Sequence, residues 1–478
     1  DYFNGMEDEN IAQAIPNAKA SEWMEENIPL FECPQRNFEE MYYYRWWSLR
    51  KHIKETPVGY GMTEFLVQRS YSDKYNLIAC AIGHHIYESR WLRDPKYLDQ
   101  IIHTWYRGND GGPMNKMNKF SSWNADAVLA RYMVDADKDF MLDMKENLEA
   151  EYQRWECTNR LQNGLYWQGD VQDGMEESIS GGRKKKYARP TINSYMYGNA
   201  KALSLMGILS DDEGMAMRYG MRADTLKRLV KDKLWNSRHQ FFETMRADSS
   251  ANVREAIGYI PWYFNLPDTV KQYEVAWKEI MDENGFSAPY GLTTAERRHP
   301  EFRTHGVGKC EWDGAIWPFA SAQTLTAMAN FMNNYPQTVL SDSVYFRQME
   351  LYVESQYHRG RPYIGEYLDE VTGYWLKGDQ ERSRYYNHST FNDLMITGLI
   401  GLRPRLDDTV EVNPLIPADK WDWFCLDNVL YHGRNLTILW DKYGDRYHRG
   451  KGLRIFVDGK QVGYADRLTR IICENVLK

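Results

Sequence analysis

Two loop sequences decide the interpretation of this 478-residue chain: residues 167–182 (WQGDVQDGMEESISGG) and residues 365–375 (GEYLDEVTGYW). The first holds four carboxylates within eight residues, next to a tryptophan. Both set acidic residues among glycines and aromatic rings, not on a charged helix face. Such surroundings can exclude water from a carboxyl group and raise its pKa towards neutrality, as a general acid requires. A solvated acidic turn is the competing interpretation, and composition does not separate the two.

Most of the chain around these loops has helical periodicity. Apolar residues recur every three or four positions in residues 75–86, 140–155, 215–230 and 345–352, the last after a cap at Ser341 or Asp342. Loops dense in Gly, Pro, Trp and Asp separate these stretches, and no repeat of fixed length is visible. A mainly α body over residues 36–401 therefore suits a closed toroid of paired helices, whose loops build a site at one mouth.

The pattern changes at about residue 402. Apolar residues then alternate with polar ones, as in a half-buried strand, and Asp458-Gly459 is a strong hairpin signal. The alternating residues are Leu436, Ile438, Trp440, Leu453, Ile455 and Val457. We predict a small β-rich region over residues 402–478. Residues 1–35 are acidic and interrupted by proline, and we expect an extended lead-in that wraps the main domain.

Composition excludes several classes of protein. The chain has 59 Lys and Arg against 67 Asp and Glu, a net charge of -8, so it lacks the basic excess of a nucleic-acid binder. No run approaches the roughly 18 consecutive apolar residues of a membrane helix. Aromatic residues make up 14%, with 17 Trp. Such rings suit stacking against sugars, although a large core is expected to use most of them.

Metal and cofactor signals are lacking as well. The six cysteines form no CxxC pair and have no histidine at ligand spacing, so neither a zinc site nor a disulfide framework is predicted. His84-His85 has no carboxylate at metal spacing, and we interpret this pair as structural. The signatures GxSxG, HExxH, GxGxxG and the Walker loop do not occur. The chain begins at Asp1, which fits removal of a signal peptide or trimming of a longer protein, and we expect a periplasmic or secreted location.

The two acidic loops resemble the paired signatures of the (α/α)6-barrel inverting glycoside hydrolases. These six-hairpin enzymes include the trehalases and the family that holds mannosylglycerate hydrolase and processing α-glucosidase I. Residues 174–178 (GMEES) resemble the loop that supplies the general acid, and residues 366–373 (EYLDEVTG) resemble the loop that supplies the base. The resemblance implies Glu176 as the acid and Glu366 as the base.

Three further segments match the family pattern in the correct order. Residues 189–195 (RPTINSY) resemble the helix start after the acid loop, and residues 312–318 (WDGAIWP) resemble the tryptophan-flanked turn that shapes the sugar pocket. Residues 385–390 (YYNHST) lie where the family has a short aromatic segment. The resemblance covers roughly residues 40 to 400. One departure is that the family acid is Asp, so Asp173 as the acid, with Glu176 binding substrate, remains open.

An inverting hydrolase also needs walls around its sugar subsites. We expect Trp167, Trp312, Trp317 and Trp375 to supply them, with about half of these rings serving as packing instead. Asp313 could bind a pair of hydroxyl groups or cap a helix. The other residues expected to bind substrate are Asp170, Arg189, Asn193, Tyr367, Tyr386 and His388.

The basic run of residues 183–189 (RKKKYAR) adjoins the acid loop. A run of this kind is usually a solvated face. Its place in an otherwise acidic protein also suits binding of a uronate or another anionic glycan.

The function predicted is an exo-acting, inverting glycoside hydrolase that removes a terminal α-linked sugar from an oligo- or polysaccharide, without metal or organic cofactor. One alternative is a polysaccharide lyase or sugar epimerase on the same toroid. Its base and its uronate-neutralising arginine would come from Tyr385, Tyr386, His388, Arg382 and Arg384. Another is a non-catalytic glycan-binding relative, which the Asp-to-Glu exchange keeps open. The sugar, the linkage and the oligomeric state are not determined.

Overall fold

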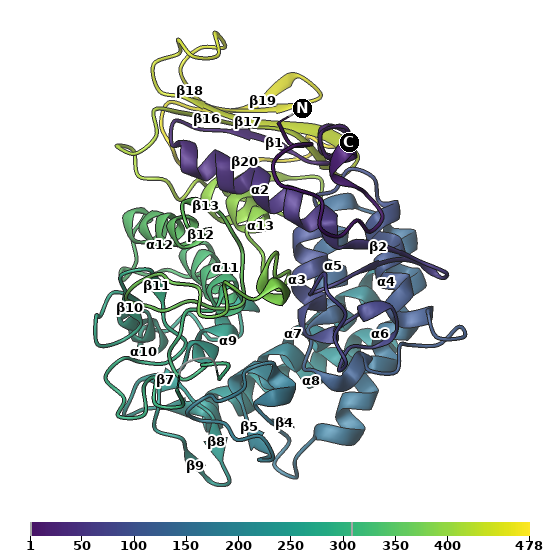
Figure 1. Ribbon diagram of the computed structural model, residues 1–478, viewed down its shortest axis with the longest axis vertical. Coiled ribbons are helices and arrows are strands. Elements are labelled where there is room, and N and C mark those ends of the chain that lie inside the picture. The colour runs from purple at the N-terminus through teal and green to yellow at the C-terminus, as the bar shows by residue number, and fades with distance from the viewer. Residues whose placement is uncertain (1, 307–308) are drawn as a thin grey trace.

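The structure is a computed structural model that describes residues 2–306 and 309–478. Helices dominate these residues, and the strands form small sheets (Figure 1). The expected mainly α class is confirmed. The α-helices are α1 (Ala20–Asn27), α2 (Arg36–His52), α3 (Ile82–Ser89), α4 (Lys96–Arg107), α5 (Asn124–Asp135), α6 (Lys138–Asn159), α7 (Pro190–Leu209), α8 (Glu213–Leu234), α9 (Ile260–Tyr263), α10 (Lys271–Glu274), α11 (Pro318–Asn334), α12 (Asp342–Ser355) and α13 (Asn392–Leu394).

Three of the four periodic stretches form helices as predicted. Their apolar residues are the buried positions of α6, α8 and α12, while the remaining positions are mostly charged. Asp137 and Asp212 cap α6 and α8 by accepting hydrogen bonds from backbone N–H groups of the first turn. Ser341 is the N-cap residue of α12, one of the two positions expected.

The fourth stretch, residues 75–86, is helical only from Ile82, so the expected single helix is wrong at its start. Tyr75 has a φ of 62°, in the left-handed region, and Ile78 is extended with a φ of -130°. Short 3-10 turns at Lys74–Asn76 and Ala79–Ala81 precede the helix. Such turns repeat every three residues, so they produce apolar spacing that resembles that of an α-helix.

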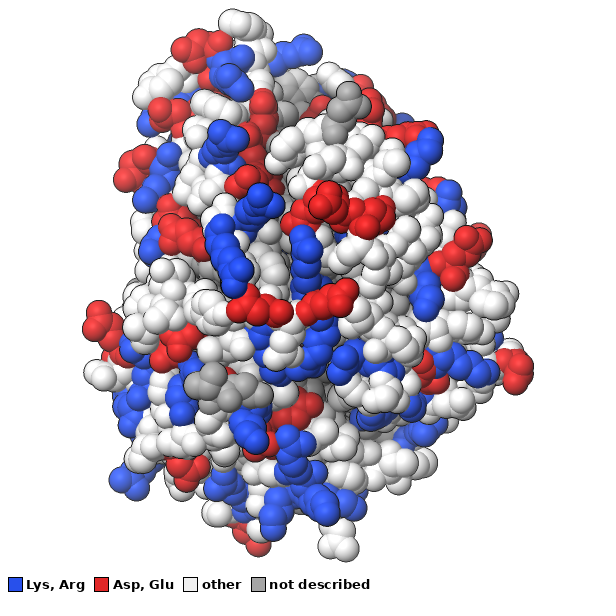
Figure 2. All heavy atoms as spheres, in the orientation of Figure 1, with Lys and Arg blue, Asp and Glu red and all other residues white. Residues whose placement is uncertain are grey.

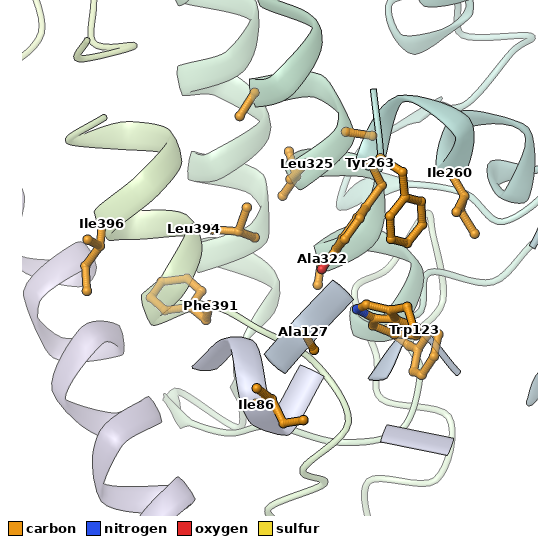
Figure 3. Packing of buried hydrophobic residues seen from close by; sticks show 14 of the residues in the cluster. Ile86, Trp123, Ala127, Ile260, Tyr263, Ala322, Leu325, Phe391, Leu394 and Ile396 are labelled. Carbon is orange, nitrogen blue, oxygen red and sulfur yellow. The ribbon is translucent and has the colours of Figure 1, made fainter. Parts of the chain in front are cut away.

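Successive inner helices pack side by side around the middle of the molecule (Figure 1). Helix α3 packs on α5, α5 on α7, α7 on α9, α9 on α11 and α11 on α13, and α13 contacts α3 again. Helices α4, α6, α8 and α12 pack against members of this series. The inner helices share one hydrophobic core, in which side chains from α3, α5, α9, α11 and α13 meet (Figure 3).

The loops that carry the expected site residues lead into the N-terminal ends of inner helices. Pro190 starts α7 after the acid loop, and Pro318 starts α11 after the tryptophan-flanked turn. Proline is favoured in the first helical turn because its fixed φ suits the helix and its missing N–H would lack a partner there anyway. The sequence therefore sets where each loop ends, and the packing of the helices brings the loop ends together.

The C-terminal region is a β structure, and its hairpin is confirmed. Strands β17 (Arg434–Asp441) and β18 (Gly452–Val457) contain the alternating apolar residues, and the turn at Asp458-Gly459 leads to β19 (Lys460–Ala465). Both turn residues have positive φ, 48° and 77°, as a two-residue hairpin turn requires. A second sheet contains β14 (Leu402–Arg403), β15 (Val410–Val412) and β20 (Ile471–Cys473).

The N-terminal segment is more structured than an extended lead-in. It includes helix α1, and its strand β1 (Leu30–Glu32) pairs antiparallel with β16 (Trp423–Tyr431) at the edge of the C-terminal sheet. Helix α2 lies close to that sheet, at the top of Figure 1. The chain therefore joins its two ends in one sheet of order β1-β16-β17-β18-β19.

The remaining strands are two to four residues long. They are β2 (Ile53–Thr56), β3 (Gly59–Met62), β4 (Trp167–Gln168), β5 (Tyr187–Ala188), β6 (Trp235–Asn236), β7 (Phe241–Phe242), β8 (Met245–Arg246), β9 (Ser249–Ser250), β10 (Ser287–Ala288), β11 (Gly291–Leu292), β12 (Tyr357–His358) and β13 (Arg361–Pro362). Strands β4, β5, β8 and β9 form a sheet that frames the acid loop. Among the described residues, none of the helices has the length and apolarity needed to cross a bilayer.

Candidate active site

Asp173 anchors the acid loop to the start of α7. Its Oδ2 atom lies 2.6 Å from Nε of Arg189, and both side chains are fully buried. Oδ2 also accepts a hydrogen bond from the Thr191 hydroxyl, and Oδ1 accepts one from the Ser121 hydroxyl at 2.7 Å. Both carboxylate oxygens are thus engaged by the protein. Asp173 as the general acid stays a prediction, and in this arrangement both of its oxygens already have partners.

Glu176, three residues further on, has a different environment. Burial raises the pKa of Glu176 to about 7, and the negative charges of Glu366 and Asp170 add to this effect, while Arg183 opposes it. The carboxyl group therefore keeps its proton in mildly acidic to neutral solution. A carboxyl in this state can donate a proton to a leaving group.

Glu366 lies in the second loop and is paired with a buried cation. Its Oε1 atom is 3.0 Å from Nζ of Lys377, and both side chains are nearly inaccessible to solvent. Oε2 accepts no hydrogen bond from the described residues, and the Arg382 guanidinium lies 3.8 Å from it. Paired backbone hydrogen bonds between Leu368 and Ile316 fix this loop to the tryptophan-flanked turn. The ion pair thus leaves one oxygen free to accept a proton.

Three aromatic rings stack beside Glu366. The rings of Trp312 and Trp317 are 4.5 Å apart and 20° from parallel, and those of Trp317 and Tyr367 are 4.5 Å apart and 14° from parallel. The Lys377 ammonium lies 4.8 Å from the centre of the Tyr367 ring. The structure therefore brings three expected substrate-binding residues together with the base loop in one rigid stack.

The other two expected tryptophans are placed differently. Trp375 is 1% exposed, and its indole N–H donates to the Tyr357 carbonyl, so this ring serves packing. Trp167 belongs to β4, and the Lys186 ammonium lies 4.3 Å over its ring. Of the four tryptophans expected to form walls, two thus stack together beside Glu366, and the other two make contacts elsewhere.

Three expected polar residues are partly or wholly used by the protein. Asn193 exchanges hydrogen bonds with the backbone of Tyr166 at 2.8 and 2.9 Å, which ties α7 to the segment before β4. Oδ2 of Asp313 accepts hydrogen bonds from the His305 backbone and ring, while its Oδ1 has no partner among the described residues. Asp170 is buried, which raises its pKa, and it accepts a hydrogen bond from the next backbone N–H.

The aromatic segment after the base also reaches the site. Tyr386 packs its ring against His388 at 4.0 Å, and its hydroxyl donates to Oε1 of Glu64 at 2.7 Å. His388 faces Trp317 at 6.2 Å, and burial holds the pKa of His388 well below its usual value, so its ring is neutral. By contrast, Tyr385 and Arg384 both bind Glu7 of the N-terminal segment.

Two residues of this site escaped the sequence interpretation. Lys377 lies eleven positions after Glu366, outside the matching motif, and Glu64 lies in a short segment without periodicity or acidic neighbours. Each is identified by its buried contacts alone. In the described part of the chain, no group of three His, Cys, Asp or Glu side chains is arranged to hold a metal ion.

Comparison with known proteins identifies the family. Residues 74–389 match the family described as the mannosylglycerate hydrolase MGH1-like glycoside hydrolase domain. The chain belongs to this family. The matched residues form a glycoside hydrolase domain of the MGH1-like family, and both carboxyl-bearing loops lie within them. Residues 402–463 match the model of the C-terminal domain of glycosyl hydrolase family 65.

Three solved structures are similar to this chain. A structure titled "Sialidase" is 92% identical over 99% of this chain, with a TM-score of 0.99, but this chain spans only 44% of that protein. The family 63 mannosylglycerate hydrolase from Thermus thermophilus is 13% identical, with a TM-score of 0.55 over 74% of this chain and 99% of that one. A family 78 rhamnosidase from Bacillus sp. GL1 is 10% identical, with a TM-score of 0.60 over 90% of this chain and 41% of that one. Because the last two structures are only 13% and 10% identical to this MGH1-like chain, they show its fold and nothing more.

Proposed function

We propose that this chain is an exo-acting, inverting glycoside hydrolase in which Glu176 is the general acid and Glu366 is the general base. The contrast between the two environments carries this proposal. Burial keeps Glu176 protonated up to a pH of about 7, whereas Glu366 forms an ion pair with Lys377 and keeps one oxygen free. One carboxyl that holds its proton, facing one that is paired with a cation and keeps an oxygen without a hydrogen bond, suits an acid and base pair.

The chemistry follows from these two environments. Glu176 protonates the glycosidic oxygen as the bond to the terminal sugar breaks, and Glu366 takes a proton from the attacking water on the opposite face of the ring. The rings of Trp312, Trp317 and Tyr367 are each 3% exposed or less and stack on one another, so we assign to them the support of the sugar pocket wall. We attribute the (α/α)6 toroid to the chain as well. The closed packing order of α3, α5, α7, α9, α11 and α13 supports it.

Product stereochemistry tests the reaction class. The substrate panel should contain aryl α- and β-glycosides of common sugars and natural oligosaccharides, with proton NMR reading the anomer of the first sugar released. An aryl sialoside belongs in the panel because the near-identical structure is titled "Sialidase", although this chain spans 44% of it. Initial release of the inverted anomer supports the proposal, and initial release of the retained anomer contradicts it. Binding without turnover would instead favour the glycan-binding alternative.

We expect activity to fall as pH rises through about 7. Burial, reinforced by the charge on Glu366, raises the pKa of Glu176 from 4.5 to about 7, so the acid loses its proton above that pH. The descending limb of kcat/KM against pH should report this ionisation. The folded protein also binds this proton more tightly than the unfolded chain does, so the contribution to stability is lost between about pH 4.5 and pH 7. A descending limb that persists unchanged in Glu176→Gln would contradict the assignment.

We propose further that the basic run of residues 183–189 favours anionic glycans. Arg183, Lys184, Lys185 and Lys186 are exposed, and Arg183 is close enough to Glu176 to lower its pKa. Strand β5, which the run enters, lies at the lower edge of the face in Figure 1, and Figure 2 shows a group of basic side chains at that edge. Arg183 is partly neutralised by Glu177 at 2.6 Å.

Changing Lys184, Lys185 and Lys186 together to Ser should raise KM for an acidic substrate by about tenfold at low salt, because attraction to the substrate is lost. The effect should shrink at physiological ionic strength, where exposed charges are screened. Removing Lys186 also uncovers the ring of Trp167, and the change in KM for a neutral substrate measures this separate effect. A matched control removes three exposed charges from the C-terminal region, at Lys451, Lys460 and Arg467. An unchanged KM for the acidic substrate at low salt would contradict the proposal.

A further inference from the structure

Glu64 is a third carboxyl group of the site. It follows strand β3 and is 5% exposed. Its carbonyl oxygen accepts a hydrogen bond from the Asn387 backbone N–H at 2.9 Å, and its Oε1 atom accepts one from the Tyr386 hydroxyl at 2.7 Å. The Tyr386 ring is held in turn between Phe65, at 4.4 Å, and His388. Glu64 is thus clamped to the aromatic segment that follows the catalytic base.

The second carboxyl oxygen of Glu64 has no partner. Oε2 is buried and makes no hydrogen bond with any of the residues described. A buried polar atom without a partner lowers stability, so its retention needs a reason. The only other glutamate oxygen in the same condition among the described residues is Oε2 of Glu366, the oxygen that we assign to the attacking water. Each of these two oxygens is therefore free to form a hydrogen bond with a ligand.

The charges around Glu64 determine its protonation state. Burial, with smaller contributions from the negative charges of Glu366 and Glu176, raises the pKa of Glu64 to about 8, although the hydrogen bond from Tyr386 lowers it. Because both charges affect its pKa, Glu64 lies close to the proposed acid and the proposed base. Because the Tyr386 hydroxyl donates to Oε1, the carboxyl proton belongs on Oε2. At neutral pH, Glu64 therefore presents an O–H donor on its unpartnered side.

We propose that Glu64 is a specificity-determining residue whose Oε2–H group donates a hydrogen bond to one hydroxyl group of the sugar that the enzyme cleaves. This inference rests on the proposed glycosidase function and adds a contact to the same site. A hydroxyl group suits the position because its oxygen accepts the bond while remaining uncharged. A sugar lacking that hydroxyl leaves the buried O–H unpaired, and sites of this kind discriminate strongly against such analogues.

The test combines three forms of the protein with deoxy sugars. Wild type, Glu64→Ala and Glu64→Gln are assayed on the best aryl glycoside of the panel and on each of its monodeoxy analogues. On the parent glycoside, Glu64→Ala should lower kcat/KM by about 100-fold or more. On the one analogue that lacks the contacted hydroxyl, wild type should be equally slow and Glu64→Ala should cause little further loss. Glu64→Gln should stay within about tenfold of wild type, because its amide reproduces both the donor and the acceptor.

A pH profile gives an independent measurement. The titratable groups that face Glu64 are Tyr71, Cys80, Glu176, Glu366 and Tyr386. Above about pH 8, kcat/KM of wild type should fall with the loss of two protons, one from Glu176 and one from Glu64. In Glu64→Gln the fall in kcat/KM should correspond to the loss of one proton only. A residue that only supports the fold would not change this slope.

The outcomes separate the inference from the function on which it rests. If wild type cleaves the glycoside and Glu366→Gln does not, the function stands. A Glu64→Ala variant that is then as active as wild type, or that loses the same factor on every deoxy analogue, overturns the role of Glu64. If wild type cleaves nothing while binding glycans, both proposals fall. If Glu64→Ala does not fold, the pH profile of Glu64→Gln still tests the inference. A slope of kcat/KM above pH 8 that is the same as in wild type overturns it.

Discussion

Replacing Glu366 by glutamine is expected to lower kcat by about 10²–10⁴-fold with little change in KM. The amide has the shape of the carboxylate, so the sugar should still bind, but it cannot take a proton from the attacking water. Hydrolysis of the preferred glycoside by wild type and variant gives the comparison directly. A matched surface control is Glu354→Gln on α12, which changes the same charge at an exposed position and should leave kcat unaltered.

The same substitution also affects stability, because it leaves the buried Lys377 ammonium without its partner. Removing one member of a buried ion pair typically costs about 3–5 kcal/mol of stability. The double variant Glu366→Gln with Lys377→Met should recover much of the lost thermal stability, since no unpaired charge remains, yet stay inactive. Inactivity in this stable protein would separate loss of the base from loss of the fold. Full hydrolysis by a folded Glu366→Gln variant would place the base elsewhere and overturn the motif assignment.

Glu176→Gln and Asp173→Asn should fail in opposite ways. Glu176→Gln should keep its melting temperature and lose about 10²–10⁴-fold in kcat on substrates with poor leaving groups. On a dinitrophenyl glycoside the loss should be much smaller, because that leaving group departs without a proton. Asp173→Asn should instead destabilise the protein by about 3–5 kcal/mol, because the buried Arg189 guanidinium then loses its ion-pair partner.

Melting curves and kinetics on the two classes of leaving group measure this contrast. Glu177→Gln is a suitable control because it lies next to Glu176 and its pair with Arg183 is partly exposed. Loss of such a pair should cost less than about 1 kcal/mol. If Asp173→Asn melts like wild type and loses activity in the manner expected of the acid, the roles of the two carboxyls are reversed. Asp173 would then be the acid, the alternative that the family signature leaves open.

Local sequence patterns determined much of the architecture. The helical stripes of α6, α8 and α12 and the hairpin at Asp458-Gly459 depend on residues that are close along the chain. The spacing of apolar side chains and the residue types in turns are local signals that extend over about twenty residues, so both can be recognised directly in the sequence. The same local reading misplaced the start of α3, because 3-10 turns around Tyr75 and Ile78 imitate helical spacing.

The sequence by itself also determined which loops carry the acidic residues and which family they resemble. Only the tertiary structure decided what each carboxyl contacts there. Asp173 meets Arg189 and Ser121, Glu366 meets Lys377, and Glu64 meets Tyr386 from 322 positions away. Protonation depends on burial and on which charges are near, and both are set by segments that approach only when the helices pack. The pKa of Glu176 and the unpartnered oxygen of Glu64 are therefore properties of the assembled fold.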